Sequence, residues 1–126
     1  MLKSKVVTIK DDGEDKKFLI TRMSAVATEE WAIETFFALA NAGVEVPDDI
    51  AAMGFAGILG IGIGALGKVE YAKAKPLLDK MMSCIQYIPD PNNEAVVRRL
   101  VDSDIQDFRN ILKLRKEVFS LHTDFT

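Results

Sequence analysis

The feature that most constrains this chain is an apolar run from Ile50 to Gly67, which reads IAAMGFAGILGIGIGALG. It carries no charged residue and holds six of the protein's eight glycines. Each glycine inside a helix costs about 1 kcal/mol relative to alanine, so six cost roughly 5 kcal/mol or more. An isolated helix here is therefore unfavourable. Packing within the fold or against another subunit has to offset this cost, so we expect the run to be in contact with other protein.

Three conformations of this run stay open. As a helix it spans roughly 27 Å, and Gly60 and Gly64 have the small-xxx-small spacing that lets two helices approach closely. It can also be an extended segment with Ile61 and Ile63 on one face, or an irregular apolar loop. We favour the packed helix and a subunit or partner interface. The residues expected to contribute to this interaction are Phe55, Gly57, Gly60, Ile61, Gly64, Met81 and Met82.

A membrane span is the main competing interpretation of Ile50–Gly67. The run only reaches the lower limit for a transmembrane helix, and neither an aromatic belt nor a basic cluster accompanies it. The first ten residues, MLKSKVVTIK, lack the long apolar core of a signal peptide. We therefore expect a water-soluble cytoplasmic protein with no membrane partner, and keep a small membrane-associated protein as an alternative.

The composition indicates a single globular domain, residues 1–126. Hydrophobic residues make up 48% and charged residues 28% of the chain, as in ordinary soluble domains. The net charge of −3 argues against a nucleic-acid partner, because phosphate binding requires a concentrated basic surface. Cys84 is the only cysteine, so no intramolecular disulfide can form, and we expect it in the core.

Near the N-terminus the pattern predicts a β-hairpin. Two runs typical of strands, Lys5–Lys10 and Lys16–Met23, flank the acidic turn Asp11–Asp15, which contains an Asp-Gly pair. The loop has two or five residues in this interpretation. The acidic turn lacks the regularly alternating oxygen ligands of a calcium loop, so we predict no metal site there.

The next segment predicts a helix with clear ends. Ser24 is a plausible N-cap, and Gly43 stands where a glycine would end the helix. Between them a wide apolar stripe, which we assign to core or interface, contains Trp31, Ile33, Phe36, Phe37, Leu39 and Ala40.

The second half of the chain predicts two more helices and a short strand. Pro76 fits the first turn of a helix, along which Leu77, Leu78, Met81, Met82 and Ile85 recur at helical spacing. Ala95–Val101 is a possible strand. Ser103 and Gln106 match the S-x-x-Q capping box of a last helix that runs to about His122. The fold class is thus α+β, mostly α, in which an N-terminal hairpin with a possible third strand near Val96 packs with three to four helices.

No catalytic, cofactor-binding or metal-binding constellation is recognisable. His122 is the only histidine, and we interpret it as a helix-end residue favoured by the helix dipole. Gly62–Gly67 matches the GxGxxG pattern but lacks the strand and βαβ unit of a dinucleotide site. Asp102 and Asp104 are interpreted as acids at a helix start. We therefore expect a protein that is not an enzyme and has no cofactor.

Two blocks and a short middle segment resemble a known family. FLITRMSAVATEEWAIETFFALANAGVEVPDDI covers Phe18–Ile50, DIQDFRNILKLRKEVFSLHTDF covers Asp104–Phe125, and PLLDKMM covers Pro76–Met82. Together they resemble small tail assembly chaperones of long-tailed bacteriophages and prophages. The resemblance rests on overall pattern across most of the chain and transfers no individual functional residues.

The resemblance implies a non-enzymatic viral assembly factor. Such a chaperone binds the tape measure protein and keeps it soluble in the host bacterial cytoplasm while tail tube protein subunits polymerise around it. It is absent from the mature virion. Many members are also made as a longer frameshifted form that carries an extra tube-binding segment. Several copies would coat one long client, so we expect a homo-oligomer. A minor structural tail or head-completion protein is the alternative.

Overall fold

The computed structural model describes residues 2–43 and 67–123. The chain divides into two compact units, Met1–Arg22 with Met81–Thr126, and Met23–Lys80. The prediction of a single domain stays a prediction. The expected α+β class is confirmed, since four strands form one sheet and the described residues contain three α-helices.

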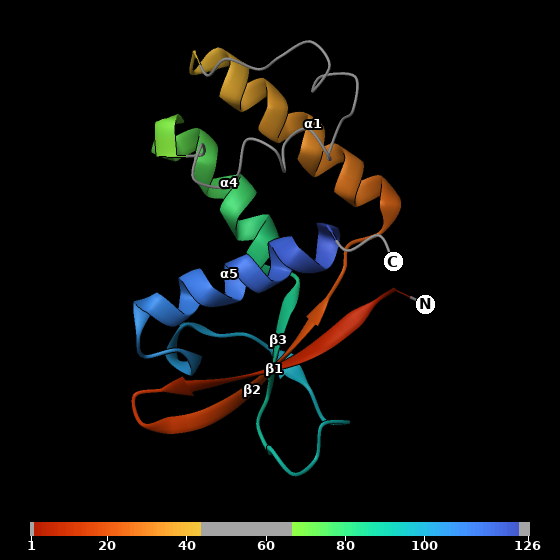
Figure 1. Ribbon diagram of the computed structural model, residues 1–126, viewed down its shortest axis with the longest axis vertical. Coiled ribbons are helices and arrows are strands. Elements are labelled where there is room, and N and C mark those ends of the chain that lie inside the picture. The colour runs from red at the N-terminus through yellow and green to blue at the C-terminus, as the bar shows by residue number, and fades with distance from the viewer. Residues whose placement is uncertain (1, 44–66, 124–126) are drawn as a thin grey trace. The chain divides into compact units, whose positions relative to one another are not determined.

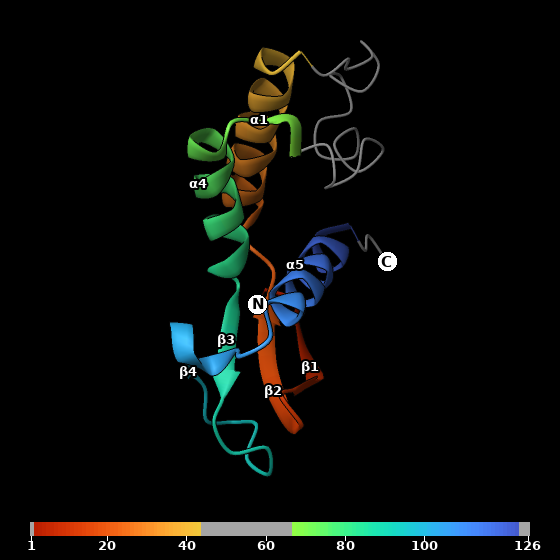
Figure 2. The same cartoon turned by 90° about the vertical axis from the view of Figure 1, so that its left-hand side faces the viewer.

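The first unit is built on an antiparallel sheet in the order β1-β2-β3-β4 (Figure 2). Its strands are β1 (Ser4–Asp11), β2 (Glu14–Thr21), β3 (Ile85–Ile88) and β4 (Arg98–Arg99). The predicted hairpin is confirmed as β1 and β2. The possible strand near Val96 is confirmed as the short β4, which pairs with β3 and not with the hairpin.

A two-residue turn closes the hairpin and fixes its register. Asp12 has φ 51° and Gly13 has φ 84°, and positive φ at both central residues is the geometry of a type I′ turn. Asp11 and Glu14 consequently face each other as the last strand pair. The shorter of the two predicted loop lengths is therefore the one observed.

Helix α5 (Phe108–Thr123) covers one face of this sheet and contacts β1 and β2 (Figures 1 and 2). Strand residues alternate between faces, and the register places Val7 opposite Phe18 and Ile9 opposite Lys16. The buried apolar side chains of this unit are Ile9, Phe18, Ile20, Met81, Cys84, Ile85, Ile88, Leu114, Val118 and Leu121. Cys84 is buried, as expected from its sequence environment.

The second unit contains α1 (Ala25–Asn41), whose predicted ends are confirmed. The Ser24 hydroxyl accepts a hydrogen bond from the Ala27 N–H at 3.2 Å. At the other end, Gly43 has φ 81° and its N–H donates to the Ala40 carbonyl. Both ends therefore follow from local chemistry that the sequence reveals.

Helix α4 (Tyr71–Met82) runs beside α1 (Figure 1). The Trp31 indole Nε1 donates to the Leu77 carbonyl at 2.9 Å and links the two helices. The predicted start at Pro76 is wrong, because α4 begins at Tyr71 and Pro76 lies inside it. Burial of Ala74 and a Lys75–Asp79 ion pair at i, i+4 support the additional turn before the proline.

The helical interpretation of Ile85 is also wrong. Helix α4 ends at Met82, and Ile85 begins β3, where it pairs with Ile20. The Thr21 N–H donates to the Cys84 carbonyl at 2.9 Å and extends the same ladder. Pairing with the hairpin therefore overrides the helical spacing of the apolar residues.

Among the described helices, none is both long and apolar enough to span a membrane. The run Ile50–Gly67, on which the membrane alternative depends, lies outside the described residues except for Gly67.

Candidate functional site

The residues predicted to form an interaction surface are only partly described. Phe55, Gly57, Gly60, Ile61 and Gly64 lie outside the described residues. Of the other two, Met81 is only 2% exposed, which places its side chain in the core and not on a surface open to a partner. Met82 is half-buried.

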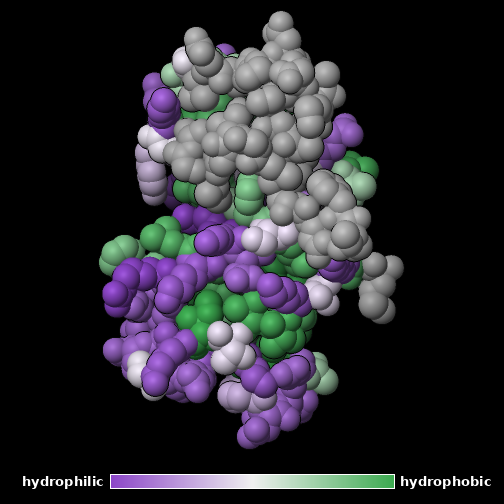
Figure 3. Space-filling model, in the orientation of Figure 1, coloured by the Kyte–Doolittle hydropathy of each residue, from purple (hydrophilic) through white to green (hydrophobic). Residues whose placement is uncertain are grey.

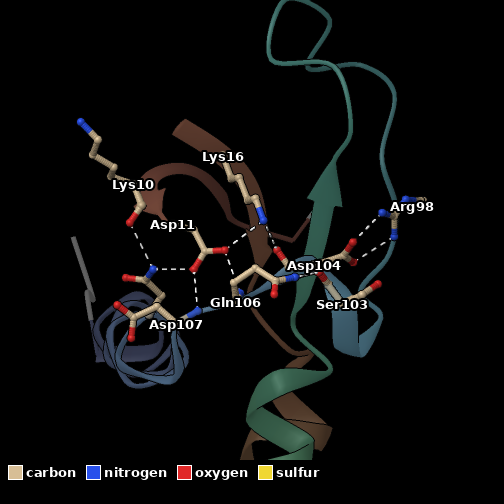
Figure 4. Close-up of polar contacts among 9 residues, drawn as sticks. Lys10, Asp11, Lys16, Arg98, Ser103, Asp104, Gln106 and Asp107 are labelled. Atoms are coloured by element: carbon tan, nitrogen blue, oxygen red, sulfur yellow. Dashed lines mark hydrogen bonds and ion pairs between the residues drawn. The ribbon is translucent and has the colours of Figure 1, made fainter. Parts of the chain in front are cut away.

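A buried polar cluster joins the end of β1 to the start of α5 (Figure 4). At its centre the Asp11 carboxylate accepts hydrogen bonds from the N–H groups of Gln106 at 2.8 Å and Asp107 at 2.9 Å. It also accepts from the Lys16 ammonium at 2.9 Å and the Asn110 amide at 2.8 Å. One carboxylate thereby fixes two segments that are about a hundred residues apart in sequence.

The electrostatics of the cluster favour two charged side chains in its interior. Asp11 is 1% exposed and Lys16 is 8% exposed. Burial alone would raise the pKa of Asp11, but the Gln106 and Asp107 N–H groups, with Lys16 and Asn110, outweigh it and hold that pKa well below its usual range. The hydrogen bond that Lys16 donates to Asp11 raises the pKa of Lys16 against the effect of burial.

A second ion pair extends this cluster toward β4. The Asp104 carboxylate binds the Arg98 guanidinium in a bidentate arrangement at 2.6 and 2.9 Å. Burial opposes the charged form of Asp104, yet Arg98 and the Val101 N–H lower its pKa. The same guanidinium lies 4.7 Å from the ring centroid of Tyr87, within cation–π range.

The predicted capping box is wrong. Ser103 lies in a short 3₁₀ helix, η2 (Asp102–Asp104), and α5 begins only at Phe108. Gln106 donates its side-chain amide to the Ser103 carbonyl at 2.7 Å. Asp102 and Asp104 do begin a helix, but it is η2 and not α5. The S-x-x-Q match failed because the backbone N–H of Gln106 is bound by Asp11, from a strand far away in sequence.

The polar cluster has the properties of a structural element. Its buried carboxylates, Asp11 and Asp104, are both saturated by hydrogen bonds that hold the fold. Within the described ranges, no three His, Cys, Asp or Glu side chains are grouped to hold a metal ion. An open hollow of about 340 Å³ lies beside the hairpin turn and is lined by Asp12, Gln106, Asp107 and Phe108. Of the two acids that line it, Asp107 is already bound by Arg109 at 2.7 Å.

His122 lies in the last turn of α5, as predicted, but the dipole does not dominate its environment. The side chain is buried, and its Nδ1 lies 2.8 Å from the Val118 carbonyl. Burial lowers the pKa of His122, and the nearby Arg22 lowers it further, although the Val118 carbonyl acts in the opposite direction. The structure therefore favours the neutral imidazole, not the imidazolium that a helix-end interpretation implies.

Two helices carry exposed apolar stripes. On α1, Val26, Ile33 and Phe37 are 70%, 46% and 57% exposed, and at 100° per residue they lie within about 40° of one another. The buried residues of α1, including Trp31 and Leu39, lie on the opposite side. The predicted wide apolar stripe of this helix is thus divided between a core face and an open face.

On α5 the exposed stripe begins with Phe108 and Leu112, which are 70% and 54% exposed. The same helix face continues to Arg115, which is half-buried. Phe119, one turn further on, is also half-buried but already takes part in another contact. On the visible side of the unit that contains the sheet and α5, Figure 3 shows hydrophobic side chains exposed among hydrophilic ones. Exposed apolar groups that share one helix face indicate an interaction surface more strongly than isolated ones.

Comparisons with protein-family models, with curated proteins and with solved structures give no match to this chain.

Proposed function

We propose that this protein is a non-enzymatic phage tail assembly chaperone. In this role it binds the tape measure protein, keeps it soluble in the bacterial cytoplasm and helps to recruit tail tube subunits. The proposal starts from the resemblance of Phe18–Ile50, Pro76–Met82 and Asp104–Phe125 to that family. The geometry of the chain adds a physical reason for such a role.

The observation that carries the proposal is the apolar surface on α1 and α5. Burying apolar area contributes about 25 cal/mol per Å², so Ile33, Phe37, Phe108 and Leu112 represent stabilisation that the isolated chain does not use. A chaperone of a long, partly apolar client needs such surface, both for the client and for neighbouring copies. An enzyme would instead need reactive side chains, whereas the buried acids Asp11 and Asp104 are saturated by structural contacts.

The decisive experiment is co-expression with the candidate client. This client is the product of the longest open reading frame encoded just downstream of the gene, and a tag on the present chain allows purification of the complex. We expect a client that is insoluble when expressed alone to become soluble, and light scattering to give many copies of the small chain per client. An insoluble client and a small protein that elutes alone would reject the chaperone role. Recovery of the protein from purified virions would support the structural-component alternative.

The contribution of Ala51–Gly67 to a subunit or client interface stays a prediction from the sequence. Gly60→Leu and Gly64→Leu place bulky side chains where the predicted helix needs close approach. We expect a smaller oligomer or a loss of client binding, measured by light scattering and by the same co-purification. Unchanged mass together with unchanged client recovery would exclude this segment from both interfaces.

A further inference from the structure

The two exposed stripes carry opposite charge. Helix α1 contains Glu29, Glu30 and Glu34 and no lysine or arginine. Glu30 falls within the apolar stripe, and the other two glutamates border it on its two sides, as expected from 100° per residue. The open face of α1 is therefore apolar, with one acid within it and one at each edge.

Helix α5 has the complementary composition. It contains four basic residues, Arg109, Lys113, Arg115 and Lys116, against a single acid, Glu117. Glu117 is bound at 2.6 Å by Lys5 of β1. Arg115 lies on the stripe itself, and its Nε has no hydrogen-bond acceptor in the described part of the chain. The open face of α5 is therefore apolar with a basic residue within it and others beside it.

The two stripes also have matching spacing. On α1 the stripe positions are 26, 30, 33 and 37, and on α5 they are 108, 112 and 115. Positions 37, 33 and 30 of α1 and positions 108, 112 and 115 of α5 both step by four and then by three residues over about 10 Å, as in helices that pack side by side. A helix with the first stripe can therefore pack against a helix with the second over this length.

We propose that α1 of one copy packs antiparallel against α5 of a second copy of this chain. The antiparallel direction places the one acid of the first stripe opposite the one base of the second. The opposed pairs are Glu30 with Arg115, Ile33 with Leu112, and Phe37 with Phe108. A parallel arrangement would instead set Glu30 against Leu112 and Ile33 against Arg115, which buries both charges against apolar groups.

This contact joins two different surfaces and therefore propagates. Each copy that uses its α1 stripe still has an open α5 stripe, and contacts of this heterologous kind close into a ring or continue as an open chain. Two copies that exchange both contacts at once would form a closed dimer. Assembly of the small chain by itself follows in each case and does not require the client.

The first test is the mass of the full-length chain by sedimentation at increasing concentration. Two helix stripes bury less than the ~1,200 Å² of a standard interface, so we expect weak association, with dissociation constants on the order of micromolar. The weight-average mass should rise above 14.0 kDa as concentration increases. A mass that stays at 14.0 kDa at every concentration would overturn the proposal. Binding of the two stripes to each other within one copy would give this result and would overturn the proposal as well.

The second test separates this contact from other modes of association. One variant, Ile33→Ser with Phe37→Ser, loses the α1 stripe, and another, Phe108→Ser with Leu112→Ser, loses the α5 stripe. Each should associate at least about tenfold more weakly than the unmodified chain. Mixed together, they retain one intact stripe of each kind and should form a heterodimer of about twice 14.0 kDa. Association of either variant alone at full strength, or no heterodimer on mixing, would overturn the proposal.

The third test concerns the direction of the helices. Glu30→Arg and Arg115→Glu should each weaken association by about three- to thirtyfold, and the double variant should restore it, because the pair is then present with reversed charge. Val96→Ser is the matched control, since Val96 is also half-exposed but lies on neither helix. Circular dichroism checks that each variant is folded. Two folded single variants without rescue in the double variant would reject the antiparallel pairing.

Discussion

Replacement of Asp11 by asparagine is expected to destabilise the unit that contains the sheet and α5. The substitution keeps the size of the side chain but removes its charge, and the new amide can accept fewer of the four hydrogen bonds described above. The Lys16 ammonium then stays buried with the Asp104 carbonyl, at 2.9 Å, as its remaining acceptor. The unpaired buried charge of Lys16 costs more than the lost hydrogen bonds, because the desolvation of the ammonium group is no longer compensated.

The magnitude follows from this loss of pairing. Breaking a buried ion pair by removing one partner costs about 3–5 kcal/mol, a large part of the roughly 5–15 kcal/mol by which small domains are stable. For a unit of this size, at about 4–8 °C per kcal/mol, we expect the melting temperature to fall by about 12–40 °C. If Lys16→Met is added to Asp11→Asn, part of the stability should return, because the buried charge is then absent.

Far-UV circular dichroism during urea unfolding measures this change. Trp31 is the only tryptophan and belongs to the other unit, so its fluorescence monitors that unit separately. Asp12→Asn is the matched control, since Asp12 is exposed at φ 51° and asparagine tolerates that conformation. We expect the control to change the free energy of unfolding by less than about 0.5 kcal/mol. If Asp11→Asn were no more harmful than Asp12→Asn, the central role assigned to Asp11 would be refuted.

The pH dependence provides a second measurement on Asp11. Its folded-state pKa is lowered below the ordinary value of 3.8. Its contribution to stability is therefore fully present above that pH and is lost as pH falls below it. We expect the loss of stability in acid to be smaller in Asp11→Asn than in the unmodified chain, and identical acid curves for the two chains would contradict the assignment.

Two further predictions concern other buried side chains. The folded-state pKa of His122 is lowered below 6.5, so the free energy of unfolding should be greater at about pH 7.5 than at about pH 5. In His122→Leu, denaturant titrations at the two pH values should show no such difference. A difference that persists in this variant would point to another titrating group. Trp31→Phe leaves the Leu77 carbonyl without its indole donor at 2.9 Å and should lower the free energy of unfolding by about 1–3 kcal/mol. Thermal unfolding followed by circular dichroism measures this change. A melting temperature within error of that of the unmodified chain would show that this hydrogen bond contributes little.

The elements that the sequence predicted correctly are those with local signals. The hairpin follows from the Asp12-Gly13 turn between two β-branched runs, and α1 follows from a capping serine and a terminating glycine. In these cases the determining residues lie within a few positions of one another. Turn and cap chemistry is therefore readable from one sequence.

The elements that were missed depend on residues far apart in the chain. Asp11 looked like one acid in an acidic turn, but its backbone partners Gln106 and Asp107 are 95 and 96 positions away. Strand β3 was not predicted, and its first residue, Ile85, was assigned to a helix because Met81, Met82 and Ile85 satisfy helical spacing. Its identity as a strand is decided by pairing with β2. No local pattern reports either contact.

A last prediction tests whether the exposed stripe of α1 contributes to the stability of the folded monomer. Ile33 and Leu39 lie on opposite faces of α1, and only Leu39, at 1% exposure, is in the core. Leu39→Ala should therefore cost about 2–5 kcal/mol through lost burial and a cavity. Ile33→Ala should change the free energy of unfolding by about 0.5 kcal/mol or less, when urea unfolding is measured at concentrations where the chain is monomeric. The same substitutions should have the opposite order of effect on self-association. If Ile33→Ala destabilised the monomer as much as Leu39→Ala, this stripe would be part of the core, and its apolar character would need no partner to explain it.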